Sequence, residues 1–107
     1  MYKRPARLLF LHHPDDRCAD FLLRRVRAHS KWIEGRTLAL PAKGDDLPRA
    51  LAWADLVVTL GGCPPPQRLP PHVQHRHWQD TSPEALQRRL QGVVGGLRLL
   101  ARLDASG

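Results

Sequence analysis

The sequence predicts a single α/β domain over residues 1–107, in which helices cover both faces of a four-stranded parallel sheet. Short apolar runs alternate with amphipathic segments along the chain, as they do in parallel sheets joined by right-handed crossovers. The clearest run, Asp55–Leu60, is apolar at almost every position, which is typical of a strand buried on both faces. A hydrophobic fraction of 42%, without an internal repeat or linker, fits one packed core.

The first predicted unit is a strand followed by a helix. Arg7–Leu11 is a short apolar run after a proline, and it leads into the polar loop His12–Asp16. From Arg17 to His29 apolar residues recur about every four positions, which indicates an amphipathic helix. Asp15 or Asp16 can cap this helix and favour its positive end.

A second strand and a short helix come next. We expect Gly35 to turn the chain and Arg36–Leu40 to form the strand, which Pro41 ends. The segment Asp45–Trp53 predicts a helix, because it begins with two aspartates and has Pro48 in its first turn.

The third strand, Asp55–Leu60, ends at Gly61–Pro66, where glycines and consecutive prolines impose an extended loop. Val73–Trp78 indicates a fourth, polar strand at a sheet edge.

The last helix begins at Thr81-Ser82-Pro83-Glu84, which combines a hydroxyl cap, an initial proline and an acidic first turn. Its apolar stripe comprises Leu86, Leu90, Val93, Val94, Leu97, Leu100 and Ala101. Gly95 and Gly96 lie inside this helix at a cost of about 1 kcal/mol each, and we expect them to allow close packing against the sheet.

The net charge of +7 comes mainly from arginine, with fourteen Arg and three Lys. A basic surface can bind nucleic acid, but the chain has no aromatic interleaving, Gly-rich RNA signature or zinc-finger spacing. We therefore expect no nucleic-acid partner, and an Arg-rich nucleic-acid binder remains a third alternative.

A cytoplasmic location without membrane attachment is the expectation. No apolar run approaches the ~18 residues of a membrane-spanning helix. The basic segment Met1–Arg7 is followed by too short an apolar run for a secretory signal. Two cysteines, Cys18 and Cys63, cannot form a disulfide framework, which fits a reducing compartment.

Several segments of the second half match a known pattern: Ala54–Leu60, Cys63-Pro64, Leu69–Val73, His77-Trp78 and Pro83–Ala85. In these segments the chain resembles low-molecular-weight tyrosine phosphatases and the arsenate reductases built on the same fold. The resemblance implies a flavodoxin-like sheet with strand order 2-1-3-4. It also implies a catalytic Cys-(five residues)-Arg loop after the first strand, and an Asp before a Pro as general acid.

The corresponding catalytic loop is degenerate. Alignment of the first strand places His12 at the nucleophilic cysteine and Cys18 at the arginine, and a shift of one residue places His13 and Ala19 there. The degenerate loop contains His12, His13, Asp15, Asp16, Arg17 and Cys18. Its two carboxylates would repel the dianion that such a loop normally holds.

The general acid is also displaced, since Ser82 precedes Pro83 and Asp80 comes two positions early. With nucleophile, oxyanion clamp and acid all missing, the sequence argues against a phosphatase. Ligands of parallel sheets bind beyond the carboxyl ends of the strands, so any site is expected near residues 12–18, 61–63 and 80–82.

Two enzymatic alternatives use other groups at this edge. In the first, Cys18 at a helix start is a low-pKa thiolate that pairs with Cys63, the position of a resolving cysteine in the arsenate reductases. The simpler interpretation is that Cys18 is a small apolar residue on the buried helical stripe. In the second, the segment His12–Asp16 resembles the His-Pro-Asp-Asp motif of zinc-dependent sugar N-deacetylases, with His13, Asp16 and His75 as metal ligands.

The primary hypothesis is a catalytically degenerate phosphatase-like domain with a binding or regulatory role. Its expected partner is a protein or a small anionic ligand, and no cofactor is expected.

Overall fold

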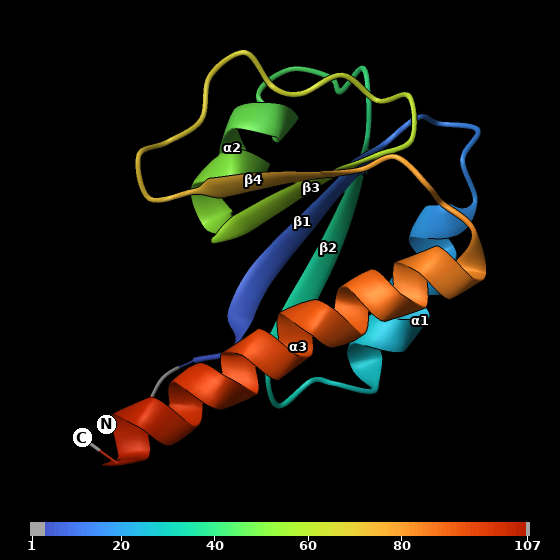
Figure 1. Cartoon of the computed structure of the whole chain (residues 1–107). Helices are drawn as coiled ribbons and strands as arrows, with labels where there is room; N and C mark the ends of the chain where they lie inside the picture. Colours follow the sequence, from blue (N-terminus) through green and yellow to red (C-terminus); the bar gives the residue numbers. More distant parts are fainter. Residues whose placement is uncertain (1–3, 107) are drawn as a thin grey trace.

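Four parallel strands form one sheet in the order β2-β1-β3-β4 (Figure 1). They are β1 (Ala6–His12), β2 (Ile33–Ala39), β3 (Leu56–Leu60) and β4 (Gln74–Trp78). The helices α1 (Cys18–Arg27) and α3 (Pro83–Ser106) cover one face, and α2 (Asp46–Trp53) covers the other. This computed structural model describes residues 4–106, and side chains as far as residue 99. The predicted α/β class, strand order and helical layers are confirmed.

The register places the carboxyl ends of all four strands at one edge of the sheet. β1 lies in the centre, where Ala6 pairs with Ile33 of β2 and Leu8 pairs with Leu56 of β3. β4 extends the sheet beyond β3, with Leu60 opposite Trp78. β2 and β4 are therefore the edge strands, as expected for the polar fourth strand.

Side chains of successive residues in β1 and β3 point to opposite faces of the sheet, so the core consists of two apolar clusters. On the side of α1 and α3, a cluster is built on Leu8, Phe10, Val58 and Leu60 with Leu22, Val26, Ile33, Trp78, Leu86, Leu90 and Val94. On the α2 side, a second cluster comprises Leu9, Leu11, Leu51, Ala54, Val57, Cys63 and Val73. Both faces of the central strands are thus buried, which explains their continuous apolar runs.

The prediction for the second strand was wrong at its start. β2 begins at Ile33, and Gly35 lies within it instead of turning the chain. A Cβ atom at Gly35 would lie 3.0 Å from Cγ1 of Val26 on α1. The glycine therefore allows α1 to approach the sheet closely, a tertiary requirement that local sequence does not reveal.

The prediction of close packing at Gly95 and Gly96 was also wrong. Both residues are exposed on α3, and a Cβ atom at either would meet nothing within 4 Å. The predicted stripe residues Leu86, Leu90 and Val94 are buried, whereas the side chains of Leu100 and Ala101 lie outside the described residues. Among helices in the described part of the chain, none has the length and apolar character to cross a membrane.

Candidate functional site

Three loops meet at the carboxyl edge of the sheet, as the sequence predicts. A Cβ atom added to Gly61, just after β3, would lie 3.8 Å from Oδ2 of Asp16 and 3.6 Å from Cγ2 of Thr81. Gly61 adopts a φ of +59°, which L-residues with side chains rarely occupy. Its amide also donates to the carbonyl of Trp78 at 2.9 Å, which ties the loop after β3 to β4.

Asp16 occupies the N-terminus of α1. Its Oδ1 accepts a hydrogen bond from the amide of Cys18 at 3.1 Å, while its own amide donates to the carbonyl of His13 at 3.0 Å. The first free amide of the helix is therefore satisfied by a carboxylate of the chain itself. An incoming anion would meet negative charge at the position where a phosphatase loop offers amides.

Three residues of the degenerate loop, His13, Asp15 and Arg17, are exposed. His13 and Asp15 are 67% and 95% exposed at their side chains, with His13 Nδ1 3.8 Å from Asp15 Oδ2. Arg17 is exposed at the start of α1, and Nδ1 of the half-buried His12 lies 2.8 Å from the carbonyl of His13. None of these contacts forms a cradle around a shared centre.

Asp80 stabilises the start of α3. The amide of Ser82 donates to Oδ1 of Asp80 at 2.9 Å, and this bond holds the pKa of Asp80 below its usual value. A general acid needs a raised pKa to carry a proton at neutral pH, so this environment opposes that role. Ser82 in turn accepts from the amide of Ala85 at 3.4 Å, which confirms the predicted hydroxyl cap.

The thiol of Cys18 is held protonated. Burial is the main cause, and the neighbouring Asp16 carboxylate adds to it, so that the pKa of Cys18 rises from 9.0 to about 12. Burial of the thiol, together with the Asp16 carboxylate at that end, outweighs the lowering of the Cys18 pKa expected from the helix N-terminus. Cys18 packs against the cluster on the side of α1 and α3, in agreement with the simpler interpretation of an apolar residue.

The two cysteines lie on opposite faces of the sheet. Cys63 belongs to the cluster on the α2 side, is 4% exposed, and has its pKa raised by burial. Both thiols are free. The sheet thus separates the two sulfur atoms that the redox alternative needs to bring together.

A histidine pair on β4 surrounds a buried hydroxyl that sequence analysis missed. Oγ1 of the fully buried Thr59 lies 3.0 Å from Nε2 of His75 and 2.7 Å from Nδ1 of His77. Nε2 of His77 lies 3.0 Å from Oε1 of Gln79. With both rings neutral, protons can be arranged so that His75 donates to Thr59, Thr59 to His77, and His77 to Gln79. The sequence feature that could have indicated this buried hydroxyl is a threonine within an otherwise apolar strand.

This arrangement uses Nε2 of His75 and both ring nitrogens of His77 in hydrogen bonds to Thr59 and Gln79. Within residues 4–99, no group of three or more His, Cys, Asp or Glu side chains could hold a metal ion. In particular, His75 bonds to Thr59 on β3, whereas His13 and Asp16 belong to the loop after β1. The structure does not bring the three candidate zinc ligands together.

An apolar groove lies on the α2 side of this edge. It has a volume of about 750 Å³, between α2 and the proline-rich loop that follows β3. Its walls include Leu40, Leu47, Leu51, Pro66 and Leu69, and among the described lining residues only Arg68 carries a charge.

Comparisons with protein-family models, characterised proteins and solved structures found no match to this chain. The resemblance to low-molecular-weight phosphatases therefore stays a prediction from the motifs.

Proposed function

We propose that this chain is a catalytically degenerate domain of the low-molecular-weight phosphatase and arsenate reductase type, with a binding role. The observation that carries the proposal is the Asp16 carboxylate at the N-terminus of α1, 3.1 Å from the amide of Cys18. A nucleophilic thiolate and a bound oxyanion are both disfavoured beside that charge. The raised pKa of Cys18 and the lowered pKa of Asp80 support the same conclusion.

The test is an assay of purified protein with p-nitrophenyl phosphate, and with arsenate and a thiol reductant. We expect no turnover above buffer at neutral pH. Turnover that disappears in Cys18→Ser but persists in Cys63→Ala would contradict the proposal, because it would show a working nucleophile.

For the binding role, we propose a small amphipathic anion in the groove between α2 and the proline-rich loop. The apolar walls supply burial, and Arg68 supplies a guanidinium for a carboxylate or sulfonate on the ligand. The net charge of +7 favours an anionic ligand over a cationic one. We retain the cytoplasm as the expected location, which two free thiols suit.

Anilinonaphthalene sulfonate, an apolar dye with one anionic group, is a suitable probe. We expect enhanced fluorescence with native protein and roughly tenfold weaker binding by Arg68→Gln, since a charge-assisted contact is lost. Arg89→Gln, at an exposed position on α3, is the matched control and should bind as the wild type does. Equal weakening in both variants, or no dye binding by native protein, would contradict the groove as the site.

The redox alternative has less support, because the sheet separates Cys18 from Cys63. The zinc alternative lacks a gathered ligand set among residues 4–99. Apart from the net charge of +7, no observation in the described part of the chain favours nucleic-acid binding.

A further inference from the structure

Within residues 4–106, the outer side of β2 presents backbone groups that no other strand pairs. β1 pairs with β2 on one side only, with Ala6 donating to the carbonyl of Trp32 and Leu40 donating to the carbonyl of His12. The N–H and C=O groups of successive residues in a strand point to opposite sides. The even-numbered residues of β2 therefore bond to β1. The amides of Gly35 and Thr37, and the carbonyls of Ile33, Gly35 and Thr37, therefore point away from the sheet.

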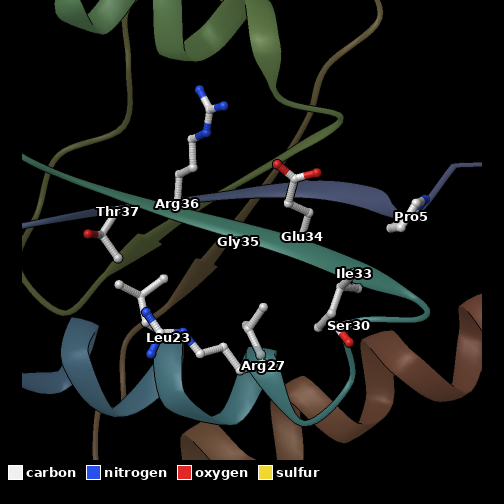
Figure 2. Close-up of a pocket in the computed structure, with 10 residues that line it drawn as sticks. Pro5, Leu23, Arg27, Ser30, Ile33, Glu34, Gly35, Arg36 and Thr37 are labelled. Atoms are coloured by element: carbon white, nitrogen blue, oxygen red, sulfur yellow. The ribbon is translucent and has the colours of Figure 1, made fainter.

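A groove follows this outer side between β2 and α1. It has a volume of about 510 Å³, and Figure 2 shows Leu23 and Arg27 of α1 on one side of the strand. Gly35 lies at its middle, and the position of its absent Cβ faces Val26 of α1, not the outer edge of the strand.

Two opposite charges flank Gly35 on the other face. Glu34 and Arg36 are both exposed and point toward the α2 side in Figure 2. Arg36 is held there by Trp53, because its guanidinium carbon lies 4.2 Å from the centre of the Trp53 ring. The order Glu-Gly-Arg makes this segment complementary to itself when two copies run antiparallel.

We propose that β2 pairs antiparallel with β2 of a second copy of this chain, with the two Gly35 residues facing each other. The pair would exchange N–H···O=C bonds between the two glycines, and each Thr37 amide would donate to the other copy's Ile33 carbonyl. In this register Glu34 of each copy lies opposite Arg36 of the other copy. The two resulting charge pairs lie on the same face of the sheet. The interface is isologous and closes as a dimer with one continuous sheet.

The strand alone supplies the attraction in this interface. Arg27 lines the groove on the α1 side, so the helical layers of two basic copies repel each other. Dimerisation should therefore depend on the charges at positions 34 and 36 and on the free amide of Thr37.

Sedimentation of the full chain over a range of concentrations tests the proposal. We expect Glu34→Arg and Arg36→Glu each to weaken the dimer by roughly tenfold, because each places like charges opposite one another. The double variant, which exchanges the two charges, should return to within about threefold of the wild type. Arg89→Glu on α3 changes the net charge as Arg36→Glu does, and should leave the dimer intact.

A backbone test is independent of these charges. Thr37→Pro removes an outward amide without removing a bond to β1, so it should yield a folded monomer by circular dichroism and sedimentation. Wild-type protein that stays monomeric up to about 1 mM would overturn the proposal. The proposal would also be overturned if the charge-exchanged double variant dimerised as weakly as either single variant.

Discussion

The hydroxyl of Thr59 lies 2.7 Å from Nδ1 of His77 and 3.0 Å from Nε2 of His75. This fully buried polar group on β3 therefore has two partners on the edge strand β4. Because a buried hydroxyl without a partner is costly, the histidines make Thr59 tolerable inside an apolar layer.

Thr59→Val should cost only about 1 kcal/mol of unfolding free energy, since a methyl replaces the hydroxyl and the exposed His77 can turn to water. The neighbouring change Val58→Thr is the matched comparison. It buries a hydroxyl in the cluster on the side of α1 and α3, and should cost about 2 kcal/mol or more. Urea unfolding measures both, and equal losses would contradict a role for the histidine pair.

Stability should fall as pH drops through the range where His75 titrates. Burial, together with the charges of His77 and Arg76, lowers the pKa of His75 below its usual 6.5. The unfolded chain therefore takes up a proton before the folded one does, so this contribution is full above pH 6.5 and is lost as pH falls toward the folded pKa. Melting temperatures between about pH 7.5 and about pH 5 should drop less steeply in His75→Gln. If the melting temperature of the variant fell with pH as steeply as that of the wild type, this assignment to His75 would be contradicted.

Gly96→Ala should stabilise the protein by up to about 1 kcal/mol. The residue is exposed within α3, and an added Cβ meets nothing within 4 Å, so the variant gains helix propensity without a clash.

Gly35→Ala is the opposite case. Its Cβ atom would lie 3.0 Å from Cγ1 of Val26, so α1 must shift, and a loss of about 1–3 kcal/mol is expected. Denaturant midpoints compare these two variants, and a stabilised Gly35→Ala would contradict the packing described for α1.

Cys18 should react slowly with iodoacetamide at pH 8 in the native protein, because its pKa is raised to about 12. In a Cys63→Ala background, Asp16→Asn keeps an oxygen for the Cys18 amide but removes the adjacent charge. Alkylation should then accelerate by up to roughly tenfold. Asp15→Asn removes the charge of a side chain that is 95% exposed, and should leave the alkylation rate of Cys18 unchanged. Mass spectrometry follows the modification, and equal rates in both variants would contradict the influence of Asp16.

The strands that depend on burial alone could be predicted closely from the sequence. Arg7–Leu11 is one residue shorter than β1 at each end, and Asp55–Leu60 starts one residue before β3 and ends with it. The agreement is close because a strand buried on both faces must be apolar throughout. β2 could not be predicted as well. Its early part contains Glu34, Gly35 and Arg36, whose local preferences favour a turn, and only the approach of Val26 explains the glycine.

The meeting of three loops followed from topology, since parallel strands end at one edge. The orientation of Asp16 could not be predicted from topology, because it depends on one hydrogen bond from the Cys18 amide. The separation of Cys18 from Cys63 likewise depends on which face each loop leaves from, and spacing along the chain carries no such information.

The two apolar clusters share no side chain, because β1 and β3 direct alternate residues to opposite sides. A change of volume beneath α2 can therefore be compensated only by neighbours in that same layer. It follows that the layer beneath α2, with its groove, can be redesigned for a new ligand while the layer beneath α1 and α3 keeps its native residues.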